Sequence, residues 1–204
     1  MAILPELEPV TPHALLWHAY DPSVKADLFS TALTTSENAL IIDPILPDAT
    51  GLEQLRATKR IRGIIVTNQN HWRGSLQLSQ QLAVPIFAHS DSALPEISVK
   101  FSPIADGDSI EDQLRVVTIQ GAAPGEIAIW CDVDDGIVVI GDALINFEPY
   151  GFGLLPPKYC VDQKMMRASL ERLLDYQFNR MFFGHGFPIM TEARARLESL
   201  LNSA

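Results

Sequence analysis

The chain has 204 residues, of which 47% are hydrophobic, so it can bury one well-packed core, and we expect a single domain over residues 1–204. Its 25 acidic residues against 15 basic ones give a formal charge of −10, which repels polyanions and excludes nucleic acid as an expected partner. No apolar run approaches the roughly 20 residues of a membrane-spanning helix, and the start of the chain is acidic and proline-rich, unlike a secretion signal. We therefore expect a cytoplasmic protein without a membrane partner, whose oligomeric state the sequence leaves open.

Hydrophobic patterning predicts three regions along the chain that differ in their arrangement of strands and helices. Three early strands, at residues 15–20, 28–34 and 38–42, are expected to form an antiparallel meander. The middle of the chain alternates helices at 51–57 and 75–82 with strands at 61–66 and 84–88. After a turn at 106–108, strands follow at 114–119, 127–131 and 137–140, then a helix at 162–174, a strand at 180–183 and a helix at 191–201. Asp162 and Thr191 are the expected N-caps of the last two helices.

Five short segments carry the motifs of the chain. They are Ile42-Asp43-Pro44, the corner T-N-Q-N-H-W-R-G at 67–74, G-A-A-P-G-E at 121–126, G-D-A-L at 141–144 and G-H-G at 184–186. In this order they resemble the signature segments of the metallo-β-lactamase superfamily, in its glyoxalase-II-like branch, over about residues 15–190. The resemblance implies an α/β fold, the four-layer αβ/βα sandwich in which two mixed β-sheets face each other and are flanked by helices.

The same resemblance implies that most metal ligands have been replaced. In the family the corner reads T-H-x-H-x-D-H-x-G. Here Asn68 and Asn70 stand for the first two histidines, Trp72 for the aspartate and Arg73 for the third histidine. Of the ligand positions only Asp142 and His185 keep a metal-binding side chain, and Ala122 replaces a further histidine.

A catalytic zinc ion needs about three protein ligands of imidazole, thiolate or carboxylate type, and neutral amides are weak zinc donors. We therefore expect no zinc and no other cofactor. A single weakly bound divalent metal at Asp142 and His185 is the alternative.

Without metal ions, a buried Asp142 needs another cation. We expect Arg73 to form an ion pair with Asp142, Asn68 and Asn70 to donate to the remaining lone pairs, and Trp72 to fill the emptied volume.

His71 falls on a spacer position of the signature, which favours a partly exposed loop histidine over a functional residue, although a one-residue slip in the loop would turn it into the site. The aromatic residues Phe147, Tyr150, Phe152 and Tyr159 either line a small-molecule pocket or pack their proline-rich loop onto the core, and packing is favoured.

Two function classes remain. The first is a non-catalytic member of the hydrolase superfamily that binds a small-molecule ligand or is vestigial, with a pocket built from Asn68, Asn70, His71, Trp72, Arg73, Asp142 and His185. The second is a hydrolase of a thioester, ester or lactone that uses a reduced or single-metal centre, with Asp142, His185 and His71 as the candidate catalytic residues. The number of lost ligands favours the first class. Whether the chain is an enzyme is left undecided.

Overall fold

The computed structural model describes residues 6–94 and 100–203, and its largest sheet has seven strands. Their order is β1 (Glu8–Thr11), β2 (Ala14–Asp21), β3 (Ala26–Thr34), β4 (Asn38–Ile42), β5 (Arg60–Val66), β6 (Ile86–Ala88) and β7 (Ser102–Pro103). The strands from β1 to β4 pair antiparallel, which confirms the predicted meander, and those from β4 to β7 pair parallel.

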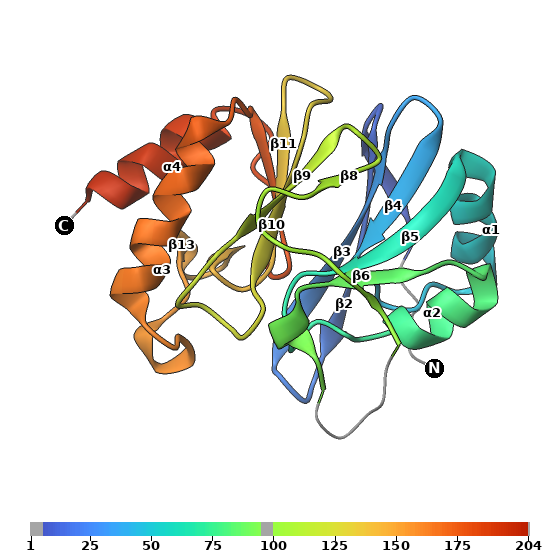
Figure 1. The fold of residues 1–204 in the computed structure, drawn as a ribbon, viewed down its shortest axis with the longest axis horizontal. Coiled ribbons are helices and arrows are strands. Elements are labelled where there is room, and N and C mark those ends of the chain that lie inside the picture. Colours follow the sequence, from blue (N-terminus) through green and yellow to red (C-terminus); the bar gives the residue numbers. More distant parts are fainter. Residues whose placement is uncertain (1–5, 95–99, 204) are drawn as a thin grey trace.

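The second sheet has five strands in the order β14 (Arg180–Phe183), β11 (Ile137–Ile140), β10 (Ile127–Cys131), β9 (Leu114–Thr118) and β8 (Ser109–Ile110). Strands β11 and β14 pair parallel, and the other pairs are antiparallel. The helices α1 (Ala49–Thr58) and α2 (Ser75–Leu82) lie on the outer side of the first sheet, and α3 (Gln163–Leu170) and α4 (Ala193–Asn202) on the outer side of the second (Figure 1).

Three hydrophobic cores separate four layers. The central core joins the two sheets, with Phe29, Leu40 and Ile65 on one side and Ile129 and Phe182 on the other. One outer core packs α1 and α2 onto the first sheet, and the other packs α3 and α4 onto the second. This arrangement confirms the expected four-layer αβ/βα sandwich of two mixed sheets flanked by helices.

A two-stranded sheet of β12 (Leu144–Phe147) and β13 (Gly151–Leu154) occupies the segment that the sequence presented as an aromatic loop. Its glycines and prolines obscured the strands, because these residues are depleted in strands. Strand β1 was missed in the same way, since its sequence Glu-Pro-Val-Thr is short and polar.

The helix ends show one correct and one wrong cap. The Asp162 carboxylate accepts from the Met165 amide at 2.9 Å, as predicted, although α3 ends at Leu170 and continues as a 3-10 turn, η3 (Glu171–Asp175). Thr191 does not cap α4: the helix follows Glu192, which has a left-handed backbone (φ 59°). Instead, the side-chain oxygen of Asn179 accepts a hydrogen bond from the Glu192 amide, at 2.7 Å, where the helix begins.

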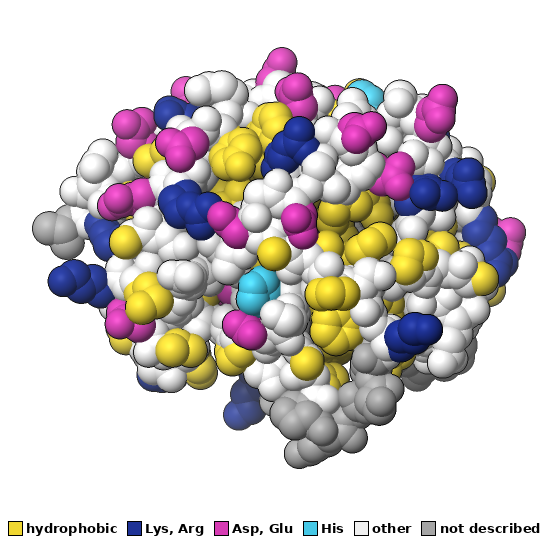
Figure 2. Space-filling view, viewed as in Figure 1, with side chains coloured by type: hydrophobic (Ala, Val, Ile, Leu, Met, Phe, Trp, Pro, Cys, Tyr) yellow, Lys and Arg dark blue, Asp and Glu magenta, His cyan; other side chains and the backbone are white. Residues whose placement is uncertain are grey.

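The surface carries no dominant sign of charge on the face drawn in Figure 2, where acidic and basic side chains are interspersed around hydrophobic ones. Over the described part of the chain, no helix is long and apolar enough to cross a membrane.

Candidate functional site

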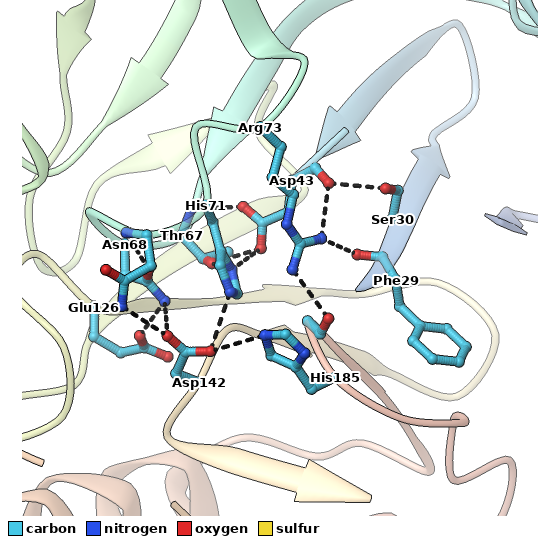
Figure 3. A network of polar contacts seen from close by, with 12 residues as sticks. Phe29, Ser30, Asp43, Thr67, Asn68, His71, Arg73, Glu126, Asp142 and His185 are labelled. Carbon is cyan, nitrogen blue, oxygen red and sulfur yellow. Dashed lines mark hydrogen bonds and ion pairs between the residues drawn. The ribbon is translucent and has the colours of Figure 1, made fainter. Parts of the chain in front are cut away.

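Four strand ends meet at one edge between the two sheets. Asp43 follows β4, the corner at 67–74 follows β5, Asp142 follows β11, and Gly184 and His185 follow β14. Because β4 pairs parallel with β5, and β11 with β14, the carboxyl end of each pair lies at the same edge of its sheet. The facing sheets therefore bring residues from four distant segments into one polar cluster (Figure 3).

His71 lies at the centre of this cluster, so the expectation of a partly exposed loop histidine is wrong. Its side chain is only 2% exposed. Nδ1 lies 2.7 Å from the Asp43 carboxylate, and Nε2 lies 3.1 Å from Asp142 Oδ1 (Figure 3). Asp43 is itself fixed by the Thr67 amide and hydroxyl, at 2.8 and 2.6 Å.

The length of the corner explains why His71 turns inward. Gly74 lies seven positions after Thr67, whereas the signature glycine lies eight positions after its threonine. Counting back from Gly74 therefore places His71, and not Trp72, at the position of the family's aspartate. This one-residue difference in spacing was the signal in the sequence.

The carboxylates around His71 set its charge. Burial lowers the pKa of His71, but Asp142 and Asp43 outweigh burial and raise it to about 9. Burial likewise disfavours the ionised form of Asp142, but His71 and His185 hold its pKa well below the ordinary value. In the metal-free protein this raised pKa favours the imidazolium form of His71, between two carboxylates.

Asp142 receives the neutral donors that the sequence predicted. The side-chain amides of Asn68 and Asn70 each lie 3.2 Å from Asp142 Oδ2, which leaves Oδ1 for the two histidines. His185 Nε2 lies 3.3 Å from this Oδ1, as expected from its place in G-H-G.

Glu126 is a site residue that the sequence reasoning missed. It is fully buried and accepts from Asn68 Nδ2 at 2.7 Å and from the Ala143 amide at 3.1 Å. Burial and the nearby Asp142 raise its pKa to about 8. A carboxylate directly after Gly125 carries no sequence pattern that would announce its burial. Glu126 therefore fixes the Asn68 side chain by a hydrogen bond and does not itself line the cavity.

The expected ion pair between Arg73 and Asp142 is wrong. The Arg73 guanidinium donates to three backbone carbonyls: Phe29 O at 2.5 Å, Asp43 O at 3.2 Å and Gly184 O at 3.1 Å (Figure 3). Within residues 6–94 and 100–203, no ion pair joins it to Asp142, because His71 already occupies that side of the carboxylate. Arg73 instead ties β3, at Phe29, to the ends of β4 and β14.

Trp72 does not fill the emptied metal volume, which corrects another prediction. Its ring is 5% exposed in the core under α1 and α2 and packs edge-on against Phe101. Its indole nitrogen donates to Ser92 O at 2.7 Å. Since His71 points into the cluster, the next side chain in this tight corner points the other way.

Gly184 lets His71 approach the end of β14. A Cβ atom at Gly184 would lie 2.4 Å from His71 Cε1, closer than real contacts allow. The glycine of the G-H-G motif thus serves packing against His71.

A cavity of about 1110 Å³ opens above the cluster, and Asn70, His71, Arg73, Asp142 and His185 lie at its polar end. The aromatic residues after Asp142 divide between the two predicted roles. Phe147, Tyr150 and Tyr159 line the cavity, whereas Phe152 packs against Phe183 of the core.

Three side chains of the cluster have the donor types of a metal site. The ligand atoms of His71, Asp142 and His185 all lie within 4.8 Å of one another. This set has one more member than the sequence predicted, because His71 joins Asp142 and His185.

Comparisons with known proteins agree with this fold and these motifs. A sequence model of the metallo-β-lactamase superfamily matches residues 9–204. The structure is similar to the DIM-1 metallo-β-lactamase, with a TM-score of 0.76 and 14% identity over 100% of this chain and 99% of that one. It is similar to a metallo-β-lactamase from Pontibacter korlensis, with a TM-score of 0.74 and 16% identity over 98% of this chain and 100% of that one.

A metallo-β-lactamase family protein from Thermus thermophilus has 20% identity and a TM-score of 0.68, over 94% of this chain and 79% of that one. No curated protein sequence matches the chain. At these identities the structural likenesses establish the fold, and the family match covers nearly the whole chain. The chain therefore belongs to the metallo-β-lactamase superfamily.

Proposed function

We propose that this protein is a hydrolase with a mononuclear centre, in which His71, Asp142 and His185 hold one divalent metal ion. The two histidine Nε2 atoms lie 3.1 and 3.3 Å from Asp142 Oδ1. Tetrahedral ligands bound at about 2.0–2.2 Å are separated from one another by about 3.3–3.6 Å. Each histidine nitrogen is thus spaced from Asp142 Oδ1 almost as two ligands of one ion are, and the ligand atoms of all three side chains lie within 4.8 Å of one another.

The orientation of the rings carries the proposal. His71 Nδ1 is bound to the Asp43 carboxylate and His185 Nδ1 lies 3.2 Å from Asp27 O, so both rings direct Nε2 into the cluster. Histidines that bind metals are oriented in this way, by an acceptor at the other ring nitrogen. His71 Nε2 is buried and lacks a well-aligned hydrogen bond, although Asp142 is near. A lone pair at that nitrogen has a metal ion as a fitting partner.

A divalent ion at this position would polarise a substrate carbonyl and lower the pKa of a bound water. The chain's own residues supply the rest. Asn68 and Asn70 hold Asp142 Oδ2 so that Oδ1 faces the histidines. Asn70 also lines the cavity, where its amide can contact a bound ligand. Three protein ligands and an open cavity fit the hydrolysis of an ester, a thioester or a lactone.

The second candidate is a metal-independent protein that binds a small molecule in the same cavity. The pKa of His71, raised to about 9 by Asp142 and Asp43, favours it, because the imidazolium then supplies the positive charge that a metal ion would bring. In that case the cluster is a structural replacement for the metal site, and the cavity retains only a binding function.

Metal analysis of protein purified without chelator separates the candidates. The hydrolase predicts about one equivalent of a divalent metal and turnover of p-nitrophenyl butyrate or a model thioester. His71→Asn and His185→Asn should each lose the metal, whereas His89→Asn, outside the cluster, should retain it. Metal bound without turnover of an ester, thioester or lactone would contradict the hydrolase. Absence of metal after incubation with zinc, manganese or iron would leave the second candidate.

A further inference from the structure

Two distant segments form the sides of the cavity above the cluster. The first is the hairpin between β2 and β3, with Val24, Lys25 and Leu28, and the second follows Asp142, with Phe147, Tyr150 and Lys158 among its residues. The volume of about 1110 Å³ lies just above the usual range for pockets that enclose whole small molecules, which is about 300–1,000 Å³. The cavity therefore has room for a ligand much larger than a water-sized or acetyl-sized group.

The sides of the cavity expose apolar surface that a ligand would cover. Val24 is 58% exposed, Tyr150 76% and Tyr159 62%. Exposed hydrophobic side chains that are scattered singly over a surface are normal, whereas large ones gathered around a concave opening mark a binding surface. Aromatic rings and aliphatic groups at these positions favour a ligand with an apolar body.

Lys25 and Lys158 add positive charge to the sides of the cavity. Neither lysine pairs with a carboxylate among the residues that the structure describes. Asp21 of the hairpin also lines the cavity, and its carboxylate accepts hydrogen bonds from the Ser23 amide and hydroxyl at 2.8 and 2.7 Å. At the polar end, the Asp142 carboxylate is surrounded by the side chains of His71, His185, Asn68 and Asn70. The Lys158 ammonium lies 4.6 Å from the centre of the Tyr159 ring, and the two lysines contrast with a chain whose net charge is −10.

We propose that the cavity binds an amphipathic anion. Its apolar body lies among Val24, Tyr150 and Tyr159, and its carboxylate or phosphate group is held by Lys25 and Lys158. As the substrate class of the reaction, this inference rests on the hydrolase proposed above. Binding itself requires only the apolar sides and the two lysines, so it is expected in metal-free protein as well.

Three probes that share one alkyl chain test the inference: decanoate and decylammonium below their micelle concentrations, and decanol below its solubility limit. Their affinities are measured by isothermal titration calorimetry on chelator-treated protein at fixed ionic strength. We expect decanoate to bind more tightly than decanol and decylammonium to bind weakest. Equal affinities for decanoate and decanol, or tighter binding of decylammonium, would overturn the inference.

Matched variants locate the binding. Lys25→Gln combined with Lys158→Gln should weaken decanoate about fivefold, the loss expected for two solvent-exposed charge contacts, and leave decanol unchanged. Lys164→Gln, an exposed lysine outside the cavity, is the charge control. Tyr150→Ser should weaken both decanoate and decanol, whereas Tyr20→Ser, on an exposed tyrosine elsewhere, should change neither. Unchanged decanoate binding in the double lysine variant would refute the role of the lysines.

The two proposals fail separately. Binding of decanoate by protein that holds no metal and hydrolyses no ester would support the amphipathic-anion site and contradict the hydrolase. Turnover of neutral esters by metal-loaded protein that does not discriminate decanoate from decanol would support the hydrolase and overturn this inference.

Discussion

Arg73 stabilises the site by holding strand β3 and the ends of β4 and β14 together, and its removal tests this directly. Arg73→Met keeps an unbranched apolar stem and deletes the guanidinium that donates to Phe29 O, Asp43 O and Gly184 O. Hydrogen bonds to charged groups contribute about 1.5–3 kcal/mol each. Two of the carbonyls keep another donor, since Ser30 Oγ binds Asp43 O at 2.8 Å and the Phe29 amide binds Gly184 O at 3.0 Å.

We therefore expect a loss smaller than the sum of the three hydrogen-bond contributions. The remaining donors keep part of that stability, and the variant no longer has to bury the guanidinium charge. Arg73→Met should lower the free energy of unfolding by about 2–4 kcal/mol. For a domain of this size, each kcal/mol corresponds to a change in melting temperature of roughly 2–4 °C. Urea denaturation followed by circular dichroism, on metal-free protein, measures the effect.

Double-mutant cycles distinguish backbone anchoring from an ion pair with Asp142. With Arg73→Met, Ser30→Ala should give more than the sum of the two single losses, because Asp43 O then loses both side-chain donors. Asp142→Asn should instead combine nearly additively with Arg73→Met. Recovery of most of the lost stability by Asp142→Asn would refute the anchoring role, and so would a single variant that melts with the parent.

Three further results follow from the contacts of the cluster. In metal-free protein the folded pKa of His71 is raised from 6.5 to about 9, so its contribution of about 3 kcal/mol is complete below pH 6.5 and is lost as pH rises through 9. The pKa of Glu126, raised to about 8, adds to this loss of stability and makes it begin at lower pH. When the free energy of unfolding is measured by denaturation from pH 6 to 10, it should therefore fall less steeply with pH in Glu126→Gln than in the parent. An unchanged slope would contradict this. Asp43→Asn should weaken metal binding about 10–100-fold, measured by competition with a chelating dye, because His71 loses its orienting carboxylate, and unchanged affinity would refute that role. Gly184→Ala should destabilise the protein by about 1–3 kcal/mol in thermal melts through its contact with His71, whereas Gly153→Ala, with open space at Cβ, should melt with the parent.

The fold could be predicted because its information is spread along the chain. Apolar runs such as Ile137–Ile140 become buried strands whatever the details of the loops, and five motif segments in order fixed their arrangement. The approach of His185 and Asp142 was predictable for the same reason, since each lies two residues after the end of a strand, β14 or β11.

The interior of the corner could not be predicted, because one residue of spacing decides which side chains point inward. Assigned from Thr67, the signature gives Arg73 to the pocket and His71 to the outside; assigned from Gly74, it gives His71 to the pocket. The partners of Arg73 lie beyond any local pattern as well. Backbone carbonyls at Phe29 and Gly184 are 44 and 111 residues away and have no side-chain signature.

The position of His71 also explains why Asp142 needs no arginine. His71 Nε2 faces Asp142 Oδ1 and holds either a proton or a lone pair. With the proton, the imidazolium compensates the carboxylate; without it, the same nitrogen and carboxylate are two ligands for a divalent ion, whose binding must release that proton. In both states a positive charge lies beside Asp142. Because one side chain would supply this charge in the metal-free protein and a ligand in the proposed metal-bound one, Arg73 is left free to bind the backbone at Phe29 of β3 and at Gly184 after β14.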